Sequence, residues 1–487
     1  MPRTVRNFSP FHTLRCFLRF AALCAVSAAS LPARAQQPQA ALSPTPPLGW
    51  NSWDSYGLTV NEAQVHENAT VLHDKLLPFG WKYVVVDEGW YFPNPEDRPH
   101  PEKLQYAMDE YGRFLPDTTR FPSSATGASP HQDGQSLIYP ATQTRAASKG
   151  LTELAAWVHA NGMLFGIHII RGIPKETVRL NLPIANSGFH ALDAADTADS
   201  CPWDPTSYGV RDNAAGQAWY DALIRQYSDW GVDFLKVDCI ADHPYRRSEI
   251  LQLHRAIEKN GNKMLLSLSP GPTALDHAAE LAPVAQMWRI SNDIWDLWES
   301  DQEFPQGVKS QFARLAKWSG YTQPGNWPDA DMLPLGELRP RPDVGPGPRS
   351  SRLSQTEQQT QMTLWAVARS PLILGSNLTL LSTDTLRLLT NRDLLRVNQT
   401  AQRSHEALHQ GDLIAWVAEL PQGQTAIAFF NLGESPMSVT PSLGALGLGS
   451  LQKTRWKDVW SGADAGRAGT VQLKLPPHGS AMLLSQR

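Results

Sequence analysis

Short apolar runs alternate with helical stretches between residues 83 and 293, and this alternation constrains the fold more than any other feature. The apolar runs are nearly continuous, as in strands buried on both faces of a parallel sheet. We expect strands at 83–90, 163–170, 232–239, 263–270 and 285–293. Helices are predicted at 151–162, 216–231 and 248–261, with glycines placed as C-terminal caps. Such repeated strand–helix units predict an α/β fold, a (β/α)8 TIM barrel.

The character of the chain changes after residue 390. Short predicted strands follow, separated by glycine and proline, at 412–420, 425–432, 437–443, 471–477 and 480–486. This pattern is typical of an antiparallel sandwich. A capping box from Ser354 to Glu357 opens the last long helix before it. Because 487 residues exceed one compact core, we predict a catalytic barrel over 46–390 and a β-sandwich over 391–487.

The first residues have the features of an export signal. Arginines precede an apolar stretch at 16–31, and Ala33-Arg34-Ala35 offers a small-x-small cleavage site. The apolar stretch is too short for a membrane span, and no later segment reaches that length. We therefore expect a signal peptide over 1–35, a linker over 36–45, and an exported protein that is secreted or periplasmic.

Charge and cysteine content narrow the possible partners. Removal of residues 1–35 takes away five arginines and no acidic residue, which lowers the formal net charge from −4 to −9. A mildly acidic exported protein is a poor binder of nucleic acid or of an anionic membrane surface. Cys201 and Cys239 remain after cleavage and are disulfide candidates in an oxidising compartment. Burial of both as free thiols is the alternative.

Polar side chains stand where the predicted strands end, which is where a βα barrel carries its active site. Lys236 and Asp238 share one strand face, an arrangement that a local salt bridge would also explain. Other strand ends carry further polar residues, namely Asp87, Glu88, His168, Arg171, Ser267, Ser269, Arg289 and Asp293. Crowded carboxylates separate into charged and protonated forms, and a retaining glycosidase needs one of each. We predict Asp238 as nucleophile, kept ionised by Lys236, and Asp293 as acid/base.

Seven motifs resemble those of glycoside hydrolase family 27, which comprises the α-galactosidases and their relatives. In order, they are PPLGWNSWDSYG, KYVVVDEGW, DEYGRFLPDTTRFPSS, VDFLKVD, WRISND, NWPDADMLPLG and SPLILGSNL. The resemblance implies a TIM barrel followed by a β-sandwich. It also implies a double-displacement mechanism that retains the anomeric configuration, with Asp238 as nucleophile and Asp293 as acid/base, and without metal or cofactor.

The resemblance extends to substrate-binding residues. It implies sugar contacts for Trp53, Asp87, Glu88, Lys236, Arg289 and Asp331, with Arg289 near the 2-hydroxyl and the paired acids at O4 and O6. The chain departs from the family by having Glu88 where aspartate is usual, His168 where tyrosine is usual, and the small Ser269 where a larger side chain is common. We expect His168 and Ser269 to belong to the substrate-binding site as well, with Ser269 leaving room near C2 or the aglycone. The extra methylene of Glu88 crowds the space of a hydroxymethyl group. That change favours β-L-arabinopyranosides, which otherwise have the configuration of α-D-galactosides.

The expected function is therefore a retaining exo-glycosidase that removes terminal α-D-galactosyl residues from oligosaccharides or polysaccharides, with β-L-arabinopyranosidase activity as the alternative within the family. The sequence leaves three other functions open. HEALH at 405–409 matches a zinc peptidase motif, Lys236 has the position of a Schiff-base lysine, and the barrel would also serve a non-catalytic galactose-binding protein. Asp296 is the alternative to Asp293 as acid/base. The sequence leaves the oligomeric state open.

Overall fold

The computed structural model describes residues 42–486, with gaps at 98–99, 101–102, 127–147, 205, 340–343, 345, 441 and 468–470. The predicted signal peptide (1–35) and most of the predicted linker (36–45) lie outside the described residues. No helix within the described ranges combines the length and the apolar character needed to cross a membrane.

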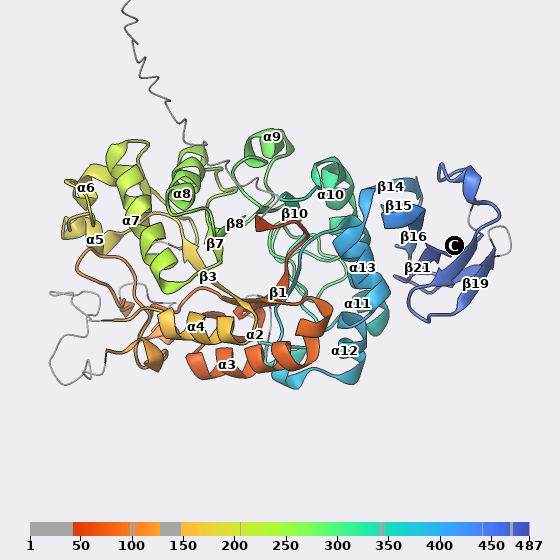
Figure 1. The fold of residues 1–487 in the computed structure, drawn as a ribbon, viewed down its shortest axis with the longest axis horizontal. Helices are drawn as coiled ribbons and strands as arrows, with labels where there is room; N and C mark the ends of the chain where they lie inside the picture. The colour runs from red at the N-terminus through yellow and green to blue at the C-terminus, as the bar shows by residue number, and fades with distance from the viewer. Residues whose placement is uncertain are drawn as a thin grey trace, which may run out of the picture. The chain divides into compact units, whose positions relative to one another are not determined.

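An eight-stranded parallel sheet forms the centre of the larger part of the described chain (Figure 1). Its strands are β1 (Leu48–Asn51), β2 (Tyr83–Val86), β3 (Leu164–Ile170), β7 (Phe234–Asp238), β8 (Leu265–Leu268), β9 (Met287–Arg289), β10 (Trp327–Asp329) and β13 (Leu372–Leu374). In space they follow the order β10-β9-β8-β7-β3-β2-β1-β13. Leu333, just after β10, forms a parallel bridge with Leu374 of β13. This bridge brings the two outer strands together, and the predicted TIM barrel is confirmed.

This part of the chain also contains helices, most of which cover the outside of the sheet (Figure 1). They are α2 (Trp53–Tyr56), α3 (Glu62–Val71), α4 (Thr152–Ala160), α5 (Lys175–Arg179), α6 (Ala191–Ala194), α7 (Ala214–Trp230), α8 (Arg247–Lys259), α9 (Ala278–Leu281), α10 (Ser310–Trp318), α11 (Gln355–Ala368), α12 (Thr383–Leu389) and α13 (Arg392–Thr400). Two helix-end signals are confirmed. The Ser354 side chain accepts from the Glu357 N–H to open α11, and Gly231 ends α7 with a φ of 86°, a conformation that favours glycine.

The barrel interior changes from apolar to polar along the strands. Near their amino ends the strands bury an apolar layer, formed by Tyr83, Val85, Phe234, Leu265, Met287, Trp327 and Ile373. Side chains alternate along a strand, so inward-facing positions recur every second residue. Continuing that alternation leads to Asp87 beyond β2, to Lys236 and Asp238 on β7, and to Arg289 on β9. The apolar layer therefore forms a floor beneath a polar carboxyl end.

Two segments differ from simple barrel connections. Between β3 and α7 the chain forms a three-stranded antiparallel sheet of β4 (Ile173–Pro174), β5 (Ala195–Ser200) and β6 (Ser207–Val210). Cys201 follows β5 and forms a disulfide with Cys239 at the end of β7, which confirms the predicted pair. One sequence-based expectation is wrong here: from the sequence we expect the NWPDADM segment at 326–332 to form a loop. Trp327–Asp329 is instead strand β10, because it pairs with β9.

The C-terminal part contains a six-stranded antiparallel sheet in the order β14-β15-β16-β21-β18-β19 and a pair β17-β20. The strands are β14 (Gln402–Gln410), β15 (Leu413–Leu420), β16 (Gln424–Asn431), β17 (Met437–Val439), β18 (Arg455–Asp458), β19 (Asp464–Arg467), β20 (Leu473–Leu475) and β21 (Ser480–Ser485). Side chains of both sheets form a separate apolar core. The predicted antiparallel sandwich is confirmed. It contacts α11, where Thr360 Oγ1 donates to the His478 carbonyl at 2.7 Å.

Candidate active site

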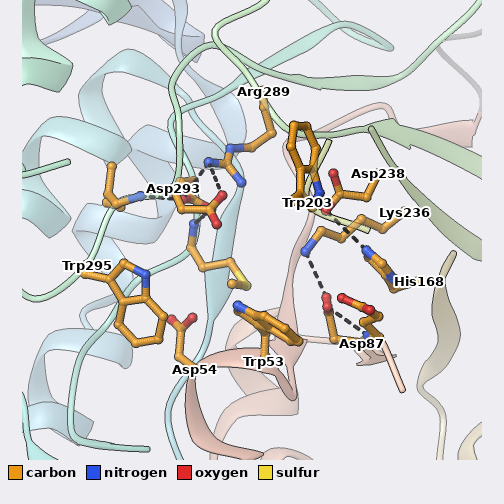
Figure 2. A pocket seen from close by; sticks show the side chains of 14 residues that line it. Trp53, Asp54, Asp87, His168, Trp203, Lys236, Asp238, Arg289, Asp293 and Trp295 are labelled. Carbon is orange, nitrogen blue, oxygen red and sulfur yellow. Dashed lines mark hydrogen bonds and ion pairs between the residues drawn. The ribbon is translucent and has the colours of Figure 1, made fainter. Parts of the chain in front are cut away.

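A pocket lies at the carboxyl ends of the barrel strands (Figure 2). It is lined by Trp53, Asp54, Asp87, Glu88, His168, Trp203, Lys236, Asp238, Arg289, Asp293, Ile294, Trp295, Asp331 and Met332. The predicted site residues all line this pocket except Ser269. That serine is buried and lines a second cavity inside the barrel, which shares Lys236, Arg289, Asp331 and Met332 with the pocket. Ser269 therefore does not face the space where it was expected to make room for substrate.

Five lining residues had not been singled out from the sequence: Asp54, Trp203, Ile294, Trp295 and Met332. Four of them lie within two residues of a predicted site residue. Their proximity along the chain is therefore the signal that could have identified them. Trp203 differs because it belongs to the segment after β5. The disulfide between Cys201 and Cys239 joins this segment to the strand that carries Asp238, and spacing along the sequence does not indicate that contact.

Asp238 ends β7 with its carboxylate directed into the pocket (Figure 2). The Cys239 N–H donates to Oδ1 at 2.5 Å, and His168 Nε2 lies 3.4 Å from Oδ2. Burial by itself would raise the pKa of Asp238. The hydrogen bond and charge of His168, together with Lys236 and the Cys239 N–H, outweigh burial and hold that pKa below its usual value. The carboxylate is therefore ionised at neutral pH, as attack on an electrophilic carbon requires.

Asp87 and Lys236 form a buried ion pair in the same pocket. Lys236 Nζ donates to Asp87 Oδ2 at 2.8 Å, and Asn51 Nδ2 donates to the same oxygen at 2.6 Å. Burial favours the neutral form of Asp87, but the Lys236 charge lowers its pKa well below the usual range. The pKa of Lys236 is raised in return, despite burial, by Asp87 and Asp238. A lysine held as ammonium cannot form a Schiff base, which argues against the interpretation of Lys236 as a Schiff-base lysine.

Arg289 connects two carboxylates on the opposite side of the pocket (Figure 2). Its Nη2 atom lies 3.2 Å from Asp293 Oδ1 and 2.7 Å from Asp331 Oδ2. The Ile294 N–H also donates to Asp331 Oδ2, at 2.7 Å. Burial raises the pKa of Asp331 to about 7; Arg289 opposes this effect, while Asp293 and Asp329 add to it. One carboxylate beside Asp293 thus exchanges protons near neutral pH.

Asp296, the alternative acid/base, is buried and paired with two arginines. Its side chain is fully buried, whereas that of Asp293 is 35 % exposed. Arg349 Nη2 lies 2.6 Å and Arg352 Nη2 3.0 Å from Asp296 Oδ1. Asp296 is not among the residues that line the pocket. Asp293 is therefore the carboxylate that can reach a bound molecule.

The zinc peptidase reading of HEALH is contradicted by the fold. His405 and His409 lie on β14, an extended strand, whereas the motif requires both histidines on one face of a helix. The described residues also contain no group of three or more histidine, cysteine, aspartate or glutamate side chains arranged to hold a metal ion. The match of residues 405–409 to the zinc peptidase motif is therefore a chance match in a strand of the sandwich.

A buried guanidinium supports the backbone beside Asp238. Arg171, at the end of β3, donates from Nε to the Cys239 carbonyl at 2.6 Å and from Nη1 to Asp199 at 2.9 Å. The same Nη1 atom donates to Glu249 Oε1 at 2.7 Å. The side chains of Arg171 and Glu249 are 2 % and 3 % exposed. One buried residue thus joins β3, β7, α8 and the β5 segment behind the pocket.

Replacement of Arg171 by methionine is expected to lower the free energy of unfolding by about 3–5 kcal/mol, because it leaves Glu249 buried without its counter-charge. Urea denaturation of the purified protein measures the change. Arg225→Met is the matched control, since Arg225 pairs with Asp229 on the exposed face of α7 and should change stability by at most about 1 kcal/mol. Equal losses in the two variants would contradict a special role for the buried network.

Residues 213–400 match the family described as "Alpha galactosidase A", and residues 410–485 match the "Alpha galactosidase C-terminal beta sandwich domain". Among curated proteins, the chain is 23% identical to an α-galactosidase of Oryza sativa subsp. japonica, with 91% of this chain and 84% of the relative covered. It is 24% identical to α-galactosidase A of Cellvibrio japonicus, with 91% and 92% covered.

Solved structures include more similar proteins. A GH27 β-L-arabinopyranosidase from Geobacillus stearothermophilus is 37% identical, with a TM-score of 0.81 and with 92% of this chain and 98% of that chain covered. A putative α-N-acetylgalactosaminidase from Bacillus halodurans C-125 is also 37% identical, with a TM-score of 0.76 and coverage of 91% and 97%. This identity over nearly the whole length, in a barrel whose mouth carries paired carboxylates, makes the chain a glycoside hydrolase that belongs to glycoside hydrolase family 27.

Proposed function

We propose that this protein is a retaining exo-glycosidase that prefers terminal β-L-arabinopyranosyl residues and also cleaves terminal α-D-galactosyl residues. The observation that carries the preference is Glu88. It lines the pocket next to Asp87 and is 7 % exposed. Asp87 is fixed by Lys236 and Asn51, so one member of the acid pair is held in place before a sugar binds.

The size of Glu88 supports the smaller sugar. Family resemblance assigns this acid pair to O4 and O6 of the bound sugar. Compared with the usual aspartate, glutamate carries its carboxylate farther from the backbone by one carbon–carbon bond, about 1.5 Å. A β-L-arabinopyranoside lacks the hydroxymethyl group of an α-D-galactoside and otherwise has the same configuration. The added methylene of the protein thus occupies the space that the missing substituent leaves.

The relatives support the same order of substrate preference. The 37% identical enzyme from Geobacillus stearothermophilus acts on β-L-arabinopyranosides, and an aspartate-to-alanine variant of it has been solved in complex with arabinose. The α-galactosidases reported above are 23–24% identical. They support α-D-galactosides as the second substrate class, because both sugars share the ring substituents that Asp87 and Arg289 would contact.

The pocket suits double displacement. In the first step Asp238 attacks the anomeric carbon, the glycosidic bond breaks, and the leaving oxygen takes a proton from Asp293. In the second step Asp293 removes a proton from water, which attacks the same carbon and releases Asp238. The lowered pKa of Asp238 keeps the nucleophile charged, and the apolar face of Trp53 offers a stacking surface for the sugar ring. Two inversions at one carbon retain its configuration.

A panel of aryl glycosides tests the proposal: β-L-arabinopyranoside, α-D-galactoside, α-N-acetylgalactosaminide and α-D-glucoside. We expect the highest kcat/KM for the arabinopyranoside and lower but measurable hydrolysis of the galactoside. Failure to cleave any of the four, combined with tight binding of free galactose, would support a non-catalytic sugar-binding protein instead. Preferential cleavage of the α-D-glucoside would contradict the assignment of Asp87 and Glu88 to O4 and O6.

Substitution of aspartate for Glu88 is expected to raise the ratio of galactoside to arabinopyranoside kcat/KM about 10- to 100-fold, since one methylene in a binding pocket is worth about 1–3 kcal/mol. Initial rates with the two aryl glycosides give the ratio directly. Glu153→Asp, the same change at an exposed position on α4, is the matched control and should leave the ratio unchanged. A ratio that stays flat or falls in Glu88→Asp removes Glu88 as the specificity determinant.

A further inference from the structure

Asp54 is a pocket residue to which neither the family resemblance nor the proposed mechanism assigns a role. It lies in α2, directly after Trp53, and 2 % of its surface is exposed. Figure 2 shows its carboxyl group between the indole rings of Trp53 and Trp295, below Asp293. Within the described residues, its buried Oδ2 atom has no hydrogen-bond partner. An unpaired buried polar group costs free energy. A ligand that supplies the missing hydrogen bond would explain why a carboxyl group stands at this position.

The orientation of this carboxyl group is restricted by the backbone behind it. A Cβ atom placed on Gly375, which follows β13, would lie 1.9 Å from Asp54 Oδ2. Only glycine therefore permits the observed position of the acid. The side chain packs against this backbone while it still lines the pocket, so it is held in place before any ligand binds.

The charges around the pocket favour a protonated Asp54. The lining residues include six carboxyl groups but only two permanent cations, Lys236 and Arg289. These cations pair with Asp87, Asp293 and Asp331. Burial raises the pKa of Asp54 well above its usual value; Asp331, Asp293 and Asp87 raise it further, and Lys236 lowers it. A protonated carboxyl group can donate one hydrogen bond and accept another.

We propose that Asp54 is a substrate-binding residue whose carboxyl group forms a hydrogen bond with a hydroxyl group of the bound glycoside. A sugar hydroxyl is the matching partner because it both donates and accepts, and because it adds no charge to a pocket crowded with carboxylates. The inference rests on the glycosidase function proposed above, but it does not depend on which of the two sugars the enzyme prefers.

The test compares Asp54→Ala and Asp54→Asn in the full-length protein. We measure inhibition constants for L-arabinose and D-galactose, together with kcat/KM for the aryl glycoside that the wild type prefers. Asp54→Ala should weaken binding of the preferred sugar about 3- to 10-fold, the range for one neutral hydrogen bond. Asp54→Asn should restore most of that loss, because an amide forms hydrogen bonds without charge. Wild-type binding in Asp54→Ala, or equal losses in the two variants, would overturn the proposal.

Thermal unfolding separates a binding role from a structural one. A raised pKa in the folded state means that the native protein binds more protons than the unfolded chain, so the contribution of Asp54 to stability falls as pH rises above the usual aspartate range. Asp54→Asn lacks this loss, so its unfolding temperature should rise relative to wild type between acidic and neutral pH. A lower unfolding temperature with unchanged sugar binding would assign Asp54 to structure and overturn the proposal.

Glu62→Gln is the matched control for a buried carboxylate outside the pocket. Burial favours the neutral form of Glu62, but bonds from His66 and Ser123 outweigh it and lower its pKa. This variant should therefore lose stability at neutral pH and bind sugars as the wild type does. If the wild type cleaves none of the aryl glycosides, the proposed function fails. Calorimetric titration of the free sugars into the Asp54 variants still decides the role of Asp54.

Discussion

Asp238→Ala is expected to lower kcat about 10⁴- to 10⁶-fold for each glycoside that the wild type cleaves, the range seen when an enzyme loses its nucleophile. The physical reason is that the variant lacks the carboxylate that attacks the anomeric carbon in the proposed mechanism. Because the pKa of Asp238 is lowered, the wild type should also keep its nucleophile charged at pH values where ordinary aspartates take up protons. Asp242→Ala, at a half-exposed position in the loop between β7 and α8, should retain most of the activity.

Azide identifies the role of Asp238 more sharply than loss of activity does. In Asp238→Ala the small anion can enter the space of the missing carboxylate and attack the anomeric carbon, and the aryl oxide leaves as the carbon–nitrogen bond forms. One displacement in place of two should give a glycosyl azide of inverted configuration, which proton NMR resolves. An azide product of retained configuration, or wild-type turnover in Asp238→Ala, would exclude Asp238 as nucleophile.

Asp293→Ala is expected to lower kcat/KM about 10²- to 10⁴-fold for glycosides with poor leaving groups, which is the usual contribution of a general acid. The loss should be much smaller for a 2,4-dinitrophenyl glycoside, because that phenolate departs without a proton. Azide should again restore turnover, but here it intercepts the glycosyl-enzyme and gives the product of retained configuration.

Asp296→Asn provides the matched control for this assignment. Its carboxylate pairs with Arg349 and Arg352 away from the pocket, so the substitution should lower stability without changing the dependence of rate on the leaving group. Equal losses for good and poor leaving groups in Asp293→Ala would argue that Asp293 only positions substrate. A leaving-group dependence in Asp296→Asn would transfer the acid/base role to that residue.

The elements predicted from the sequence are those whose pattern of apolar residues agrees with their burial in the folded protein. The apolar runs that contain β2, β3, β7, β8 and β9 were visible because both faces of these strands are buried. Strands β1 and β10 were not predicted because their sequences, LGWN and WPD, contain glycine, asparagine, proline and aspartate, which are depleted in strands. Strand β13 was missed although its residues, LIL, are apolar. In the sandwich, the polar strand β14 went unrecognised because its side chains are largely exposed and carry no apolar alternation.

The catalytic candidates were found for a related reason. Alternation along a strand places Lys236 and Asp238 on the same inward face, and parallel strands bring their carboxyl ends to one mouth. These two rules, together with the family motifs, led to nine residues that line the pocket and one, Ser269, that does not. Trp203 escaped detection because a disulfide brings its segment to the mouth.

By itself, then, the order of residues determined the barrel, the sandwich and the set of acids at the barrel mouth, because alternation and strand direction are properties of a local segment. Tertiary structure alone decided which acids are paired and which keep a proton. Lys236 reaches Asp87 across 149 residues of chain, whereas the Asp54 carboxyl is buried against Gly375 without a partner for Oδ2 among the described residues. Charge states follow from burial and from distances between side chains, and these exist only once the chain has folded.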